Sequence, residues 1–151
     1  MWNPKDFDIK ANSRGGEWCQ LVNPATGEDL CIEVNGKTIK SRVKMLGPKS
    51  EAGIKAMAES KRKVRDQEAR EKRFEKRKET YVPSEDEIDA NEKSDIEYCI
   101  AMATEWEGIP DIEKKGEAKF VKAEKERIFS SDGIRSQLIT FSVNPLNFIK
   151  G

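Results

Sequence analysis

The chain has 151 residues, of which 37% are charged, and its 28 basic and 28 acidic side chains give a formal net charge of zero. Leu, Ile, Val and Phe together number 31, about a fifth of the chain, which is close to the lower limit for burying enough apolar surface to fold. These totals favour a single domain with a small core, and no apolar run is long enough for a membrane-spanning helix.

The first third of the chain has the pattern of a small sheet. Residues 1–16 carry little pattern, and we expect them to form a flexible N-terminal arm. The stretch NPATGED separates two short apolar runs, and Asn35-Gly36 favours a tight hairpin before a third run. An antiparallel β-meander with one apolar and one basic face is therefore predicted over 17–47. Its strands are expected at 18–22, 30–34 and 38–46.

A long charged helix is predicted over 50–79, because the segment is rich in Ala, Glu, Lys and Arg and has no Pro. Between Lys61 and Glu79 it has ten basic and five acidic residues, so we expect its second half to project into solvent. Its first half carries an apolar stripe made of Ile54, Met57, Ala58 and Val64.

The C-terminal half is predicted to be helical. Ser84 and Glu87 match a capping box at the start of a core helix that we expect over 84–107. Shorter helices should follow at 117–149, and PLNFI forms an apolar tail. The predicted class is α+β, mainly α: a small N-terminal three-stranded antiparallel sheet followed by a helical bundle. The single domain should cover 17–151, divided into the meander at 17–47, the charged helix at 50–79, the core helix at 84–107 and the C-terminal helices at 117–149.

The residues needed for common catalytic and metal sites are missing. The chain has no histidine, so Ser-His and Cys-His arrangements are absent and a zinc site is disfavoured. It has no GxxxxGK[ST] or GxGxxG loop to hold phosphates. Cys19, Cys31 and Cys99 have no CxxC spacing, and MWNPKDFDIK does not resemble a signal peptide, which favours reduced thiols in a cytoplasmic protein. We predict a non-enzyme with no catalytic, cofactor-binding or metal site.

The basic stretch at 61–78 raises the alternative of a small nucleic-acid-binding protein. Acidic residues interrupt this stretch, and Phe74 is its only aromatic residue, so it lacks the stacking ladder typical of single-strand binding. A solvated helical face is the preferred interpretation, and we expect no nucleic-acid partner.

Several short motifs occur in a characteristic order along most of the chain from Trp18. They are Pro24-Ala25-Thr26-Gly27-Glu28, then Gly47-Pro48-Lys49-Ser50 before the charged helix, then Trp106-Glu107-Gly108-Ile109, and finally Phe141, Asn144 and Phe148. This combination resembles the tail assembly chaperones of siphophages. The chain departs from the family pattern at Lys49, where the family usually has Asp, and at Glu117-Ala118-Lys119-Phe120, which replaces an apolar-Pro-Phe piece.

The resemblance implies a chaperone that binds the tape measure protein and keeps it soluble while tail tube protein polymerises around it. It also implies self-association, a place in the host cytoplasm and absence from the mature virion, and in many members a longer frameshifted form. The tail tube protein is a further candidate partner. A structural tail or connector protein that stays in the virion is the alternative. Trp106, Phe141, Leu146 and Phe148 are the candidate partner-binding residues, with ordinary core packing as their other interpretation.

Overall fold

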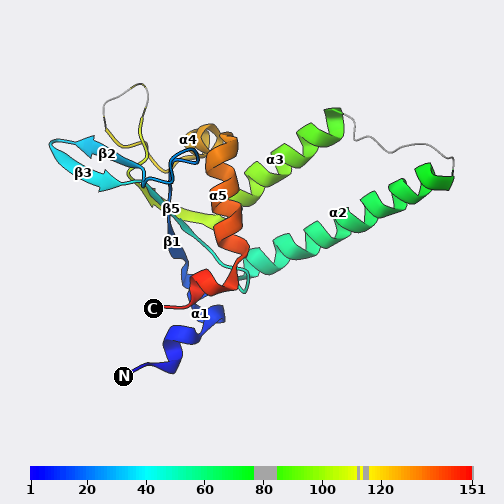
Figure 1. Cartoon of the computed structure of the whole chain (residues 1–151), viewed down its shortest axis with the longest axis horizontal. Helices are drawn as coiled ribbons and strands as arrows, with labels where there is room; N and C mark the ends of the chain where they lie inside the picture. Colours follow the sequence, from blue (N-terminus) through cyan, green and yellow to red (C-terminus); the bar gives the residue numbers. More distant parts are fainter. Residues whose placement is uncertain (77–84, 112, 114–115, 151) are drawn as a thin grey trace.

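The computed structural model describes residues 1–76, 85–111, 113 and 116–150 (Figure 1). Helices predominate and accompany a small antiparallel sheet, so the expected α+β, mainly α class is confirmed. Every described helix is too short or too polar to cross a membrane. In chain order the elements are the 3₁₀ helix η1 (Pro4–Phe7), α1 (Ile9–Gly15), β1 (Glu17–Gln20), β2 (Cys31–Val34), β3 (Lys37–Lys40), β4 (Arg42–Met45), α2 (Glu51–Lys76), α3 (Glu85–Met102), β5 (Ala103–Glu107), α4 (Lys122–Phe129), α5 (Asp132–Val143) and the 3₁₀ helix η2 (Pro145–Phe148).

The central sheet has three strands in the order β1-β4-β5, and both neighbouring pairs are antiparallel. The strands expected in the meander do form, but they do not pair consecutively. β1 pairs with β4, and the third member, β5, comes from a segment that we expected to be helical. On β4 the buried residues Val43 and Met45 alternate with the partly exposed Arg42 and Lys44, as expected for a sheet covered on one face.

β2 and β3 form a separate two-stranded hairpin. The turn residues Asn35 and Gly36 have φ angles of 51° and 77°, the left-handed conformation that a type I′ turn needs at both central positions. The Asn-Gly hairpin prediction is therefore confirmed. Ile32 lies opposite Ile39 across the ladder.

Ser41 divides the strand expected at 38–46 into β3 and β4. Its N–H donates to the Leu30 carbonyl oxygen, and its own carbonyl oxygen accepts from the Leu21 N–H, both at 2.9 Å. Its hydroxyl donates to the Gly108 carbonyl oxygen at 2.6 Å. Because these bonds tie Ser41 to three different segments, the chain leaves the hairpin and enters the central sheet at this residue.

The core lies between the central sheet and the helices α3, α4 and α5, which gather beside it (Figure 1). The indole of Trp106 on β5 packs edge-on against the rings of Phe120 and Phe129, with ring centroids 5.0 and 6.0 Å away. Leu138 of α5 is fully buried in the same cluster. The core consists of Cys19, Leu21, Val43, Met45, Cys99, Met102, Ala103, Trp106, Ile109, Ala118, Phe129 and Leu138.

The helix expected over 84–107 ends at Met102, and β5 begins at the next residue without an intervening loop. Ala103 pairs with Met45 and Trp106 pairs with Val43, so pairing with β4 replaces the last helical turn. Residue 84, the expected N-cap, lies outside the described residues, as do 77–79 at the end of the other long helix.

The first sixteen residues were expected to be a flexible arm, but the structure has η1 and α1 there. α1 packs against η2 near the other end of the chain. The buried Asn12 side chain donates to the carbonyl oxygens of Phe148 at 2.7 Å and of Asp6 at 3.2 Å. The Lys150 N–H donates to the Asp6 carbonyl oxygen at 2.8 Å. These non-local bonds, which local sequence pattern does not encode, hold the segment in place.

Candidate functional site

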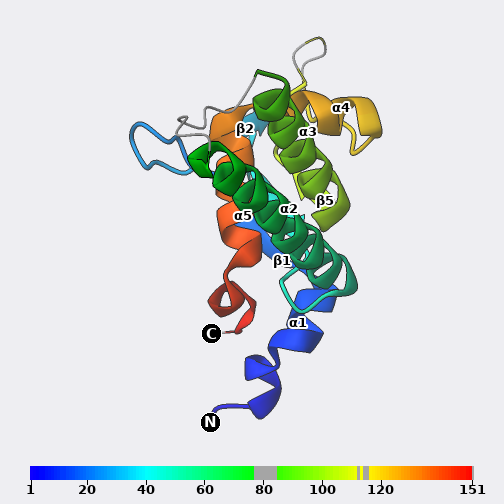
Figure 2. The ribbon, with the colours of Figure 1, turned by 90° about the vertical axis from the view of Figure 1, so that its right-hand side faces the viewer.

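The most prominent surface is an arm formed by α2 and the first half of α3, which project from the rest of the chain (Figures 1 and 2). α2 has 26 residues and is about 39 Å long at ~1.5 Å per residue. From Ile54 to Arg73, only Ala56 and Glu71 are partly buried and every other residue is exposed. Core packing therefore contributes little to most of this helix, and the helix propensity of its Ala, Glu, Lys and Arg residues is its main support.

The two helices of the arm are joined by polar contacts. Arg70 forms an ion pair with Glu87 at 2.9 Å, and the Lys63 ammonium group donates to the Ser94 hydroxyl. Lys63 and Arg70 are seven residues apart, which places both on the side of α2 that faces α3. Exposed pairs of this kind contribute at most about 1 kcal/mol each.

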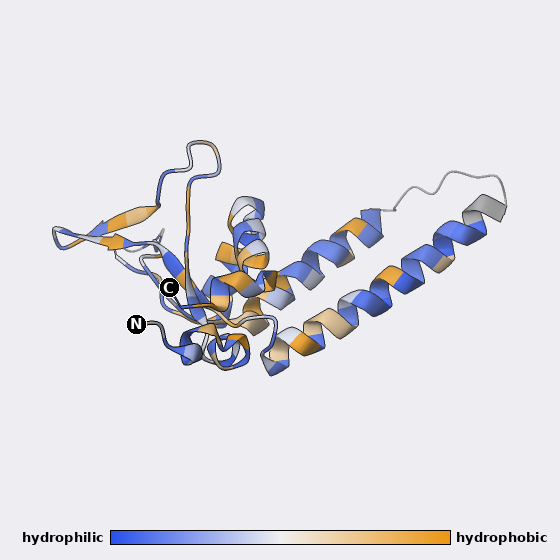
Figure 3. Cartoon of the chain, turned by 60° about the horizontal axis from the view of Figure 1, so that its bottom comes forward, coloured by the Kyte–Doolittle hydropathy of each residue, from blue (hydrophilic) through white to orange (hydrophobic). Residues whose placement is uncertain are grey.

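Three apolar residues of α2 lie on a different side of the helix and form what we call the α2 stripe. Ile54, Met57 and Val64 are 57%, 47% and 51% exposed. At ~100° per residue they lie roughly 110–170° around the helix from the side that contacts α3. Figure 3 shows α2 as a mostly hydrophilic helix interrupted by separate hydrophobic patches. The sequence identified this stripe, but its residues are exposed and not packed against the core.

The two helices of the arm carry opposite charge. Residues 61–73 include seven basic and three acidic side chains, whereas residues 85–95 include six acidic and one basic. The attraction between them is screened within about 10 Å at ~0.1 M salt. The basic excess of α2 therefore begins beside Val64, at the end of the α2 stripe, whereas Ile54 and Met57 lie in the less charged first part of the helix.

The candidate partner-binding residues divide into buried and exposed groups. Trp106 is 8% exposed, and its indole N–H donates to the Ala118 carbonyl oxygen at 2.9 Å. Phe148 is fully buried and packs against the ring of the partly buried Phe141, with centroids 5.7 Å apart. Leu146 alone is well exposed, at 69%. The structure does not bring the four together as one surface, and core packing accounts for Trp106 and Phe148.

The sheet face that was expected to be basic is largely neutralised by β5. Arg42 forms an ion pair with Glu107, and Lys44 lies 3.7 Å from Glu105. Both cations also lie over the ring of Trp18, with Arg42 4.5 Å and Lys44 5.8 Å from its centroid. These cross-strand pairs stabilise the sheet, so this face lacks the free positive charge that would bind phosphates.

Comparison of the chain with protein-family models, with curated proteins and with solved structures finds no match.

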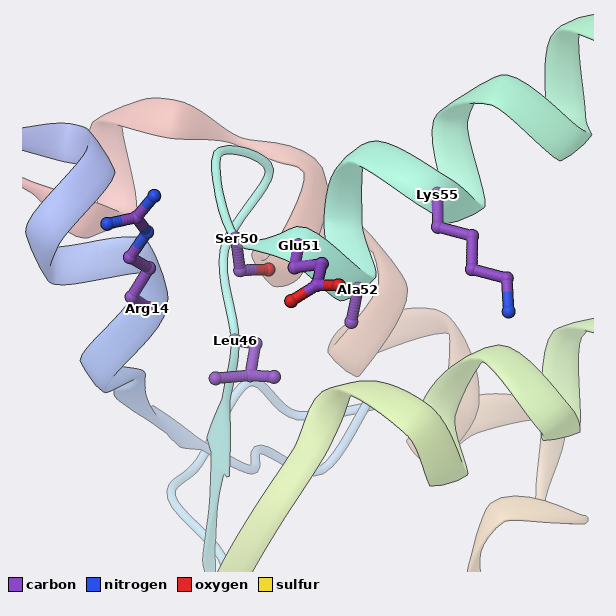
Figure 4. Close-up of a pocket in the computed structure, with 6 residues that line it drawn as sticks. All are labelled: Arg14, Leu46, Ser50, Glu51, Ala52 and Lys55. Atoms are coloured by element: carbon purple, nitrogen blue, oxygen red, sulfur yellow. The ribbon is translucent and has the colours of Figure 1, made fainter.

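A surface depression with a volume of about 570 Å³ lies between α1 and the start of α2 (Figure 4). The Ser50 hydroxyl in it is already used at the start of α2, since it donates to the Gly47 carbonyl oxygen at 2.6 Å and accepts from the Gly53 N–H at 3.1 Å. Lys55 points away from Arg14 in Figure 4. The depression holds no convergent set of catalytic groups. Its lining is Arg14, Leu46, Ser50, Glu51, Ala52 and Lys55.

Within the described residues, no three Cys, Asp or Glu side chains are placed to hold a metal ion together. The cysteines differ in exposure, because Cys31 is exposed whereas Cys19 and Cys99 are buried. Burial raises the pKa of the Cys19 thiol to about 11 and that of Cys99 to about 12, above their ordinary value of 9.0. These two thiols are therefore protonated in the folded chain at neutral pH, and weak nucleophiles.

Iodoacetamide at pH 8 should modify Cys31 alone, giving one adduct by intact mass, and denaturant should expose all three cysteines. The raised pKa values of Cys19 and Cys99 stabilise the fold fully below about pH 9, and this contribution is lost as the pH rises through 11 and 12. Urea unfolding midpoints should accordingly fall above pH 9. Rapid modification of Cys19 or Cys99 in the folded chain at pH 8 would contradict this assignment.

Proposed function

We propose that this chain is a non-catalytic assembly chaperone that binds a helical polypeptide through the α2 stripe. The supporting observation is a 26-residue helix that leaves Ile54, Met57 and Val64 about half exposed on the side away from α3. Apolar side chains spaced three and seven residues apart match the contact rows of a second helix packed along the first. Exposed apolar side chains of this kind add little to the stability of the fold, and they are suited to binding another chain.

The partner in this proposal is the tape measure protein of a siphophage, with the tail tube protein as a further partner. The motif order from Trp18 to Phe148 suggests this family, and the charge pattern is compatible with it. An arm with both charge signs and few apolar contacts suits binding that is reversible and sensitive to salt. The chaperone would act in the host cytoplasm, associate with copies of itself, and leave before the virion is complete.

A triple variant, Ile54→Gln, Met57→Gln and Val64→Gln, tests the surface. Each replacement should remove ~1 kcal/mol of apolar contact with the partner, so affinity for the tape measure protein should fall about 100-fold. Stability should change little, because the positions are exposed and Gln is a good helix former. Co-expression, co-purification and soluble yield of the tape measure protein are the measurements.

The matched control is Val121→Gln, since Val121 is 48% exposed and lies before α4, outside the arm. This variant should keep full binding. Equal binding by the triple variant would reject the α2 stripe as the surface, and failure of the unaltered chain to change tape measure solubility would reject the function. Mass spectrometry of purified virions distinguishes the chaperone from the alternative. A structural tail or connector protein would be present in stoichiometric amount, whereas the chaperone should be absent.

A further inference from the structure

β1 is an outer strand of the central sheet, and one of its edges faces away from β4. The Leu21 N–H donates to the Ser41 carbonyl oxygen, continuing the ladder between β1 and β4. Because backbone groups alternate in direction along an antiparallel ladder, Cys19 points its N–H and C=O toward β4, whereas Trp18 and Gln20 point theirs outward. Among the described residues, none bonds to these outward groups of Trp18 and Gln20.

Val22 is the next residue along this edge whose backbone N–H and C=O point away from β4, and its two groups do have a partner. The Gln137 side chain of α5 accepts from the Val22 N–H at 2.8 Å and donates to the Val22 carbonyl oxygen at 2.9 Å. This amide makes the same two bonds that a residue of a neighbouring strand would make. The fold thus satisfies the edge at Val22 and leaves it unpaired at Trp18 and Gln20.

A groove of about 380 Å³ lies where this edge meets the flank of α5. Its sides are supplied by β1 and by α5 with the residues that follow it, and it is lined by amides, hydroxyls, one thiol and one aromatic ring. No carboxylate, ammonium or guanidinium group belongs to its lining, although the chain is 37% charged. The lining residues are Cys19, Gln20, Ser136, Gln137, Thr140, Phe141, Asn144 and Asn147.

We propose that this groove binds an extended, uncharged segment of a partner protein, which adds as a strand to the outer edge of β1. Strand addition to an exposed sheet edge is a general mode of peptide recognition, in which backbone hydrogen bonds hold the segment and neighbouring side chains select its sequence. Here Trp18 and Gln20 offer the backbone groups, and Thr140 and Asn144 offer neutral polar contacts. A charged side chain would lose water without gaining a counter-charge. The groove is separate from the α2 stripe and does not depend on the proposed function.

The occupant is a single segment and not a second copy of this chain. Antiparallel pairing of β1 with β1 of another copy would place two α5 helices on the same face of the joined sheet, both beside the shared edge. Their flanks would then compete for the space that one groove provides. An isolated extended segment carries no flanking helix and avoids this overlap.

A phage-displayed library of random dodecapeptides, selected against the folded full chain, tests the proposal. Enriched peptides should be poor in Asp, Glu, Lys and Arg and rich in strand-forming residues. A synthetic copy of the most enriched peptide should slow hydrogen exchange of the Trp18 and Gln20 amides. Thr140→Trp, which fills the groove from an exposed helical position, should weaken its binding at least tenfold. The matched control, Val143→Trp, places the same ring at an exposed position of α5 outside the lining and should leave binding unchanged.

Both variants should keep the circular dichroism spectrum and melting temperature of the parent chain, which shows that loss of binding is not loss of folding. Three results would overturn the proposal. These are failure to enrich any peptide above background, equal binding by the Thr140→Trp variant, and exchange protection on strands other than β1. Self-association that Thr140→Trp abolishes would also overturn it, because the edge would then take a second copy.

Discussion

Replacing Trp106 with alanine is expected to lower the free energy of unfolding by about 4 kcal/mol, within the ~3–5 kcal/mol range for large aromatic deletions in a core. The indole is 8% exposed and contacts the rings of Phe120 and Phe129. Its removal also leaves the Ala118 carbonyl oxygen without its 2.9 Å hydrogen bond. Since small domains have only about 5–15 kcal/mol of stability, this loss is a large fraction of the total, and the variant should melt at a clearly lower temperature than the parent chain.

The control is Trp2→Ala. This substitution removes the same kind of side chain from the surface, because Trp2 is 74% exposed. It should change the free energy of unfolding by less than about 0.5 kcal/mol. Urea titrations followed by circular dichroism give both values. Equal effects of the two variants would show that Trp106 does not occupy the core. If Trp106→Ala folds normally but loses binding to the tape measure protein, the residue acts at a partner surface.

Replacing Gly108 with alanine is expected to cost about 4 kcal/mol, comparable to the loss of a core side chain. Gly108 has a φ angle of 66°, a conformation that costs other residues ~1–2 kcal/mol. An added Cβ would lie 2.6 Å from the Lys40 carbonyl carbon and 2.9 Å from the Ser41 nitrogen. These are backbone atoms at the junction of β3 and β4, so the clash can be relieved only by moving the sheet, which adds ~1–3 kcal/mol.

Gly27→Ala separates these two contributions. Gly27 has a similar φ angle of 74°, but nothing lies within 4 Å of an added Cβ. This variant should lose only ~1 kcal/mol, from the backbone conformation alone. Thermal and urea unfolding of both variants measure the difference. A Gly108→Ala variant no less stable than Gly27→Ala would show that the approach of residues 107–109 to Ser41 is looser than the structure describes.

The segment ATEWE illustrates why part of the fold could not be predicted from the sequence. Ala and Glu favour helices, and the segment continues a helical pattern, so a helix to Glu107 was the local expectation. β5 forms because Trp106 pairs beside Val43 on β4, far away in the sequence, and becomes part of the core. Strand formation depends on such neighbours more strongly than helix formation does. The hairpin at Asn35-Gly36 was predictable because the turn chemistry is contained in two adjacent residues.

The candidate site shows the same limit. The apolar residues of the α2 stripe and the solvated second half of α2 were recognised in the sequence. Periodicity cannot distinguish a stripe that packs against the core from one that faces solvent, since both have the same spacing. That distinction depends on where α3 lies, and the contacts of Lys63 and Arg70 show which side of α2 faces it. The unpaired edge of β1 could not be predicted from the sequence either, because the order of strands along the chain does not reveal which strand lies at the edge of the sheet.

The position of β4 between β1 and β5 determines when the sheet can close as the ribosome makes the chain. β1 and β4 emerge within 29 residues of each other, whereas β5 follows only after the whole of α2 and α3. Translation at ~5–20 residues per second separates β4 from β5 by about 3–12 s. During that interval the second edge of β4 has no partner strand, and the Trp106 indole that completes the core has not yet been made. The pairing of the central sheet is therefore complete only after β5 has emerged.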